Sequence, residues 1–293
     1  MPREVEPSLN EKQFVLHALQ ENTRTDGRAF DQFRELDLTF GDEYGVADVR
    51  LGNTRVLVKV SAEVTKPFPD RPFDGIFTIT TELSPMASPS FEPGRPSEAE
   101  ILLSRLLEKT LRRSSALDTE SLCLVAAQKV WSVRADVHIL SYDGNLIDTS
   151  CLAIVAALQH FRKCDTSIEG ETVTIYTPAE REPVPLSLLH LPFCVTFSFY
   201  NGQDELVLVD TTLLEEQLRD ASVTISMNRH GEICQIAKLG GAPIDAVVLL
   251  QCTSLAAVKT KDLNRLVGKK LEEDKKGRDK GGLIAELSAE NAR

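Results

Sequence analysis

The sequence predicts an α+β protein built from two similar halves, in which mixed sheets pack against helices. Residues 34–83 alternate apolar and polar side chains, as strands do. Residues 151–158 form an Ala-, Leu- and Val-rich run that is typical of a buried helix. After residue 193 the chain repeats the order of several strands followed by a helix. Strands and helices grouped in this way are typical of α+β packing.

The sequence argues against a membrane-spanning or secreted protein and against a generally basic nucleic-acid binder. Hydrophobic residues make up 42% and charged residues 26% of the 293 positions, as in ordinary globular proteins. No apolar run approaches the ~18 residues of a membrane span, and Met1–Asn10 lacks the apolar core of a signal peptide. We therefore expect an intracellular protein with no membrane partner. The net charge of −11 excludes a generally basic nucleic-acid binder, so contact with nucleic acid requires a local basic patch.

The cysteines and histidines show no spacing that is typical of a metal site. The six cysteines are scattered, without C-x-x-C spacing: Cys123, Cys151, Cys164, Cys194, Cys234 and Cys252. We expect them to be small buried hydrophobes in a reducing compartment. The histidines are equally dispersed: His17, His138, His160, His190 and His230. We therefore expect no metal and no cofactor.

Residues 1–30 predict an N-terminal helix and arm. The helix is expected from Asn10 to Glu21, because Asn10 with Gln13 resembles a capping box. A charged turn follows at residues 24–28.

The first half of the protein is predicted to span residues 31–165. Its strands begin at Arg34 and end at Leu83, and Gly52-Asn53 between two of them is a hairpin signal. After a Pro- and Ser-rich loop, Ser97 is expected to cap a helix that continues to about Arg113. A further strand is predicted over Val130–Leu140.

The turn before the buried helix has the geometry of an anion site but lacks its charge. Asp143-Gly144-Asn145 is a turn signal. Asp148, Thr149 and Ser150 are good N-cap residues, and a helix N-terminus binds anions readily. The turn holds no Lys or Arg, although a charge-assisted hydrogen bond is roughly twice as strong as a neutral one. We interpret this combination as an enzyme fold that has stopped being an enzyme.

The rest of the chain repeats the same order of elements. A connection at residues 166–191, with a strand at Val173–Tyr176, leads to a second half at residues 192–260. Its predicted strands are Phe193–Tyr200, Glu205–Asp210, Ala221–Met227 and Glu232–Leu239. A long helix follows Pro243 and is predicted to run in pieces to about Lys276. Residues 261–293 are expected to be a C-terminal helix and a charged tail.

The helix predicted over residues 97–113 carries a row of basic side chains. Arg105, Lys109 and Arg112 are spaced by four and three residues, which places them on one helical face. Four leucines are expected on the opposite, buried side: Leu102, Leu103, Leu106 and Leu107. From spacing alone, a solvated face is favoured over a binding face.

Several segments together resemble one subgroup of a known family. They are Arg24–Arg28, Gly52–Val58, Met86–Arg95, Leu117–Cys123 and Tyr176–Ser187. Over about residues 10–285 the chain resembles the RNase PH-like ring subunits of the eukaryotic RNA exosome, of the PM/Scl autoantigen type. The resemblance implies an RNase PH-like fold, with β-α units like those of ribosomal protein S5 domain 2.

The resemblance also implies partners and a process. The expected partners are RNase PH-like paralogues that form a six-subunit ring, RNA-binding cap subunits, a hydrolytic exoribonuclease docked on the ring, and single-stranded RNA. The implied function is that of a non-catalytic subunit in 3′-to-5′ RNA processing and degradation. That includes maturation of rRNA and snRNA 3′ ends and surveillance of mRNA and tRNA. The implied location is the nucleus and nucleolus, and also the cytoplasm.

For the sites, the resemblance implies no catalytic residue. Active relatives bind phosphate with an Arg or Ser-Arg where this chain has Asn145-Leu146. Their general acid aligns nearest Glu216, and without the cation there is no nucleophile to orient. We expect the carboxylates of this region to be structural or solvated: Asp210, Glu215, Glu216 and Asp220.

RNA contact is implied for the basic helix. Arg105 and Lys109 fall on positions that contact RNA in the related non-catalytic archaeal ring subunit. Arg112, Arg113 and Arg95 are further candidates. Two alternatives stay open: a phosphate-dependent 3′-to-5′ exoribonuclease with a rebuilt site, and an isolated RNA-binding module.

Overall fold

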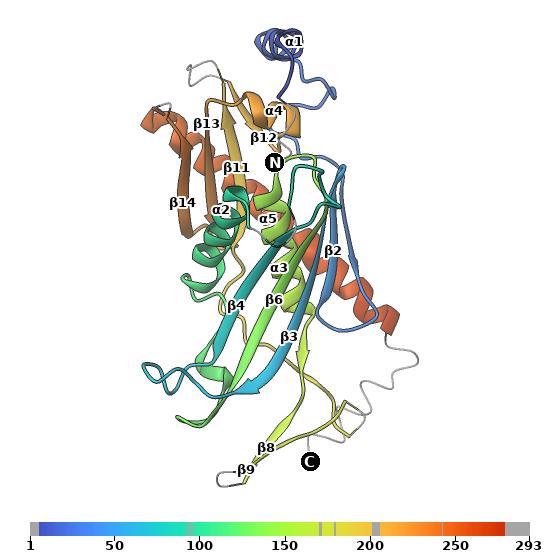
Figure 1. Cartoon of the computed structure of the whole chain (residues 1–293), viewed down its shortest axis with the longest axis vertical. Coiled ribbons are helices and arrows are strands. Elements are labelled where there is room, and N and C mark those ends of the chain that lie inside the picture. The colour runs from blue at the N-terminus through green and yellow to red at the C-terminus, as the bar shows by residue number, and fades with distance from the viewer. Residues whose placement is uncertain are drawn as a thin grey trace.

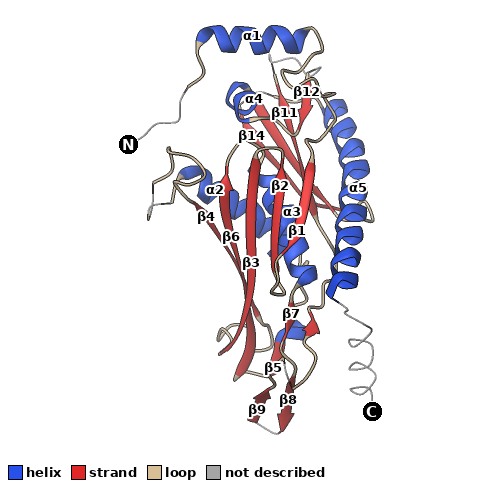
Figure 2. Cartoon of the chain, turned by 90° about the vertical axis from the view of Figure 1, so that its right-hand side faces the viewer, coloured by secondary structure: helices blue, strands red, loops and turns tan. Residues whose placement is uncertain are grey.

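The α+β class is confirmed by a computed structural model. It describes residues 6–92, 94, 96–169, 172–178, 180–200, 206–241 and 243–278. The molecule is elongated, with helix α1 (Leu9–Gln20) at one end and the hairpin of β8 (Thr166–Glu169) and β9 (Thr172–Ile175) at the other (Figure 1). Two large sheets lie between these ends, and helix α5 (Ala246–Arg278) runs along one side of both (Figure 2).

The first sheet has the strand order β1-β2-β3-β6-β4, with β5 also paired to β6. Its strands are β1 (Leu36–Phe40), β2 (Val46–Leu51), β3 (Thr54–Thr65), β4 (Ile76–Leu83), β5 (Cys123–Val125) and β6 (Lys129–Ser141). The β4–β6 pair is parallel and the other pairs are antiparallel. Leu51 faces Thr54 across the turn at Gly52, so the predicted hairpin is confirmed.

The second sheet has the order β12-β11-β13-β14. Its antiparallel strands are β11 (Phe193–Phe199), β12 (Val207–Val209), β13 (Ala221–Met227) and β14 (Ile233–Gly240). Every residue of β11 is buried, because helices cover both of its faces. Since side chains alternate along a strand, Cys194 and Thr196 face helix α3 (Leu146–His160), whereas Val195 and Phe197 pack in the core under α5.

Helix α3 is buried along almost its whole length, as predicted, and packs between the first sheet and β11. The predicted cap is wrong. The helix begins at Leu146, and its N-cap is Asn145 in a left-handed conformation (φ 54°) without a side-chain cap. Asp148 instead accepts hydrogen bonds from Thr196. The Thr149 hydroxyl donates to the Asn145 carbonyl over 2.8 Å.

Helix α1 begins earlier than predicted. Ser8 is the N-cap and forms a full capping box with Glu11, so the predicted box of Asn10 and Gln13 is wrong. Both pairs have the same spacing, but only Ser8 and Glu11 combine a hydroxyl with a carboxylate. The helix packs on the second half through Val15 and Leu19.

The predicted helix of residues 97–113 consists of two kinds of turn. Ser97 caps α2 (Glu98–Leu107), and the chain then continues as a π-helical turn, η1 (Glu108–Arg112). Leu103, Leu106 and Leu107 are buried, but Leu102 is 45% exposed, so its predicted burial is wrong. Consecutive helical residues differ by about 100°, which moves Leu102 to the margin of the buried face.

Helix α5 is continuous, so its predicted interruption is wrong. It joins the two cores, because Cys252 and Ala256 pack in the second and Val267 packs in the first. Its last turn is fixed to the first half by Arg278, whose guanidinium lies 4.8 Å from the Tyr44 ring centroid. Arg278 also donates to the Asp42 carbonyl over 2.7 Å.

The remaining elements are short: η2 (Glu120–Leu122), β7 (Arg162–Lys163), β10 (Val184–Pro185) and α4 (Leu213–Leu218). The predicted strand at Val173–Tyr176 corresponds to β9. Glu205, in another predicted strand, and the charged tail at 279–293 lie outside the described residues. Across the described ranges, no helix is long and apolar enough to cross a membrane.

Candidate nucleic-acid interface and anion site

A buried carboxylate, Asp210, organises the turn where the sequence predicts an anion site. Asp210 follows β12, is fully buried and has a φ of 51°. It accepts hydrogen bonds from the Arg34 backbone N–H over 2.7 Å and from the Arg34 guanidinium over 2.9 Å. The Asn145 side-chain amide donates over 2.8 Å, and Arg28 donates over 3.0 Å. Asp210 therefore joins the N-terminal arm to the turn before α3.

The ionisation of Asp210 follows from these contacts. Burial alone would raise its pKa, but the hydrogen bonds and charge of Arg34, together with Asn145, outweigh burial, so the pKa lies below the ordinary value. A general acid must hold a proton to donate. The contacts of Asp210 therefore favour its ionised form.

Glu215 is likewise engaged in structure. Arg24, buried in the arm, donates from Nε and Nη2 to the two carboxylate oxygens over 3.1 and 2.6 Å. Its Nη1 donates to the Val209 carbonyl over 3.0 Å. The Glu215 side chain also completes the capping box of α4 with Thr212. This bidentate ion pair therefore holds α4 against the arm.

The carboxylate of Glu216 lies at the N-terminal end of α3. It accepts hydrogen bonds from the Asn145 backbone N–H over 3.3 Å and from the Tyr142 hydroxyl over 3.4 Å. Its other oxygen accepts from Arg219 over 2.7 Å. A helix N-terminus favours a nearby anion, and here the chain supplies that anion from α4. Asp220, the fourth carboxylate considered, is exposed.

Asp148, in the first turn of α3, is a further buried carboxyl group. It accepts from the Thr196 N–H over 2.9 Å and from the Thr196 hydroxyl over 2.7 Å. Burial raises its pKa to about 7, and the nearby charge of Asp210 acts in the same direction.

The basic residues of α2 and η1 are all exposed. Arg112 pairs with Glu108 over 3.0 Å. The side chains of Arg105, Lys109 and Arg113 form no hydrogen bond or ion pair with any residue that the structure describes. Arg95 lies outside the described residues.

The π-turn changes which of these residues share a face. Arg113 donates its backbone N–H to the Glu108 carbonyl, five residues earlier, over 3.1 Å. Because such a turn holds more residues than an α-helical turn, Arg113 follows Lys109 along the face of Arg105. From this geometry we expect Arg113, rather than the Arg112 of the sequence prediction, to share a face with Arg105 and Lys109.

Comparison with known families identifies the fold. Residues 32–163 match the "3′ exoribonuclease family, domain 1" and residues 190–259 match its "domain 2". The chain belongs to the RNase PH family. The RNase PH-like fold implied by the sequence motifs is therefore confirmed.

Curated relatives show which RNase PH-family proteins this chain is similar to in sequence: components of the exosome complex. The chain is 50% identical to the exosome complex component rrp45 of Schizosaccharomyces pombe, over 100% of both chains. It is 46% identical to the RRP45 component of Saccharomyces cerevisiae, over 100% of this chain and 99% of that protein. The human RRP45 component is 46% identical over 93% of this chain and 62% of its own length. The resemblance to exosome ring subunits is confirmed.

Solved RNase PH-like structures have the same architecture. A chain of the Archaeoglobus fulgidus exosome with RNA bound to the active site superposes with a TM-score of 0.76 at 32% identity, covering 87% of this chain and 97% of that one. A chain of an archaeal exosome core gives a TM-score of 0.70 at 28% identity, covering 90% and 96%.

Sequence reasoning missed the arginines that surround Asp210. Arg24 and Arg28 lie in the quoted motif, but no local signal indicates that Arg24 pairs with Glu215 and Arg28 with Asp210. Arg34 lies 176 positions from Asp210. Only the fold brings the two together.

Proposed function

We propose that this chain is a non-catalytic subunit of an exosome-type ring and supports 3′-to-5′ RNA processing and degradation by associated nucleases. The observation that carries the proposal is Glu216 of α4, whose carboxylate accepts from the Asn145 N–H at the N-terminal end of α3. The turn itself holds no Lys or Arg, and the neighbouring Arg34 and Arg219 are already paired with the carboxylates of Asp210 and Glu216. A phosphorolytic enzyme needs a charged donor there, and losing one such donor costs on the order of 3 kcal/mol in the transition state.

In the ring, the chain would contribute a surface along which RNA passes. Arg105, Lys109 and Arg113 present unpaired cations on one exposed face. Neutralising phosphates supplies most sequence-independent affinity for nucleic acid. On a chain of net charge −11, this face offers RNA a local site, in line with the similarity to an exosome structure that contains RNA.

The proposed partners follow from the similarity to exosome components. They are RNase PH-like paralogues in a six-subunit ring, RNA-binding cap subunits, a hydrolytic exoribonuclease and single-stranded RNA. The proposed processes are maturation of rRNA and snRNA 3′ ends and surveillance of mRNA and tRNA. The proposed location is the nucleus and nucleolus, and also the cytoplasm.

The lack of phosphorolysis is tested with the purified chain, alone and paired with each RNase PH-like paralogue. Oligoadenylate and inorganic phosphate are added, and release of ADP is measured. We expect no release above a buffer control. Release that disappears on substitution of Glu216 or Asp210 would instead establish a rebuilt phosphorolytic site.

The RNA path is tested on the reconstituted ring. Arg105→Glu with Lys109→Glu should shorten RNA protection and remove crosslinks at α2. Each lost phosphate contact should reduce the salt slope of binding by about one. The control is Lys269→Glu with Lys276→Glu, two exposed lysines of α5 that give the same change in charge. Equal protection by both double variants would show that the α2 face is only solvated.

A further inference from the structure

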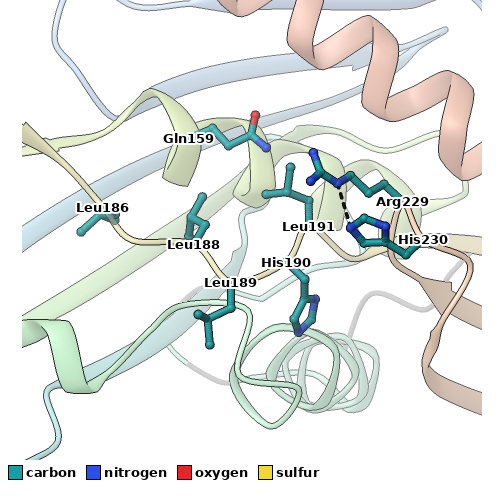
Figure 3. Close-up of a pocket in the computed structure, with 8 residues that line it drawn as sticks. All are labelled: Gln159, Leu186, Leu188, Leu189, His190, Leu191, Arg229 and His230. Carbon is teal, nitrogen blue, oxygen red and sulfur yellow. Dashed lines mark hydrogen bonds between the residues drawn. The ribbon is translucent and has the colours of Figure 1, made fainter.

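A pocket of about 320 Å³ lies at the opposite end of α3 from the Asp210 cluster. Four leucines between residues 186 and 191 line it, together with Gln159 near the end of α3 (Figure 3). Arg229 and His230, from the turn between β13 and β14, close one side. Asn145 and Gln159 are separated by about 20 Å along the helix, so this pocket is separate from the anion-site turn.

His190 leaves an unused hydrogen-bond acceptor at this pocket. Its Nε2 lies 2.7 Å from the Ser114 carbonyl oxygen, which can only accept, so Nε2 carries the proton and donates. Nδ1 of the neutral ring is therefore an acceptor. It is buried and has no partner among the described residues. An unpaired buried acceptor is destabilising, and a ligand N–H would relieve this.

The pocket combines exposed aliphatic surface with positive charge. Leu188 and Leu191 point toward Gln159, whereas Leu189 and His190 point to the other side of the same segment (Figure 3). Leu189 is 62% exposed. Arg229 and His230 are exposed too, and Arg229 Nε donates to His230 Nε2 over 3.1 Å. On a chain of net charge −11, the exposed Arg229 guanidinium beside aliphatic walls is complementary to an acidic, aliphatic ligand.

We propose that this pocket binds a short acidic segment of a partner protein. An aliphatic side chain of the segment packs against Leu189, a carboxylate pairs with Arg229, and a backbone N–H donates to His190 Nδ1, which lies on the same side as Leu189. Proteins bind nucleobases by stacking them on aromatic or guanidinium planes. Four leucines give the pocket aliphatic walls, and a peptide supplies both an aliphatic side chain for these walls and a carboxylate for Arg229, so a peptide fits better than RNA. The proposal does not depend on the RNA path along α2.

The test uses the full chain and a displayed random-peptide library. Peptides are selected on the wild-type chain and counter-selected on Leu189→Asp. An enriched peptide is then labelled with fluorescein for anisotropy. Leu189 and Arg229 are exposed, so Leu189→Asp and Arg229→Glu should fold normally, which circular dichroism verifies. The matched controls on α5 are Leu250→Asp and Arg265→Glu, both at exposed positions.

We expect the enriched peptides to share Leu, Ile or Val beside Asp or Glu. Leu189→Asp and Arg229→Glu should each weaken binding about tenfold or more, and the α5 controls should leave it unchanged. The proposal is wrong if no peptide is enriched or if the pocket variants and the controls bind equally. It is also wrong if oligoadenylate displaces the peptide, because the pocket would then belong to an RNA site.

Discussion

Asp210 and Asp148 show how position decides the chemistry of a carboxyl group. They lie on either side of Asn145, and both are buried. Asp210 is surrounded by arginine donors that hold its pKa down. Asp148 has burial against it and only the neutral donors of Thr196 and Asn145 in its favour, so its pKa rises to about 7. One carboxylate is therefore a fixed anion, and the other titrates near neutral pH.

The raised pKa of Asp148 predicts a specific pH dependence of stability. The folded state binds the Asp148 proton more tightly than the unfolded state, whose pKa is about 4. The stabilisation is therefore present at acid pH and is lost as pH rises from about 4 to about 7. Asp148→Asn should remove this slope, so the wild type should lose roughly 1–4 kcal/mol relative to the variant between pH 5 and pH 8.

Urea unfolding of both proteins at each pH measures this difference. Asp210 has a lowered pKa, so its contribution to stability is lost as pH falls below its unfolded pKa. Both proteins contain Asp210, so its contribution cancels when their stabilities are compared. Parallel stability curves for the two proteins would show that Asp148 does not titrate in this range.

At the scale of elements, the π-turn η1 changes the direction in which the side chains after α2 point. Its buried residue Thr110 donates from its hydroxyl to Gln235 of β14 over 3.0 Å, which fixes the turn against the second sheet. The same turn brings Arg113, rather than Arg112, to the face of Arg105. π-turns are frequent at functional sites.

This geometry predicts different effects at two neighbouring positions with the same side chain. Arg113→Glu should reduce RNA crosslinks to α2 in the reconstituted ring and lower the salt slope of binding by about one. Arg112→Glu should change either quantity little, because Arg112 lies off this face and already pairs with Glu108. If the Arg112 variant has the larger effect, the α-helical spacing rather than the π-turn describes the RNA-facing side.

The elements that the sequence predicted best are those with a regular pattern of apolar and polar residues. The alternation of β2 and β3 and the apolar run of α3 determine both their type and their burial. Helix ends were predicted less well, because several nearby residues could serve as caps. Ser8 rather than Asn10 caps α1, and Asp148 bonds to Thr196 across the core instead of capping α3. The π-turn and the arginines around Asp210 depend on tertiary contacts, which no local pattern contains.

At the scale of the whole molecule, α5 mechanically connects the two halves. Its first half packs in the second core and its later part in the first core, through Val267. A continuous helix shared by two cores should make them unfold together.

A charge placed at one of these contacts tests the coupling. Val267 is fully buried, so Val267→Asp should cost about 3–5 kcal/mol by burying an unpaired carboxylate. The first half should then melt before the second. Val258→Asp is the matched control, because Val258 is 57% exposed on the same helix and should change stability by less than about 0.5 kcal/mol.

Scanning calorimetry distinguishes the outcomes. We expect one transition for the wild type and for Val258→Asp, and two for Val267→Asp. A single transition at lower temperature in Val267→Asp would show that contacts other than α5 hold the halves together.

The carboxylate of Glu216 acts as a tethered competitor. Because it is attached to the same chain, its effective concentration at the Asn145 N–H is on the order of millimolar or higher, whatever the solution contains. Free phosphate would have to displace it before meeting the helix. A cation introduced at Leu146 would therefore meet an anion that is already in place. Binding phosphate at this turn would need two changes together, a new cation and the removal of the Glu216 carboxylate.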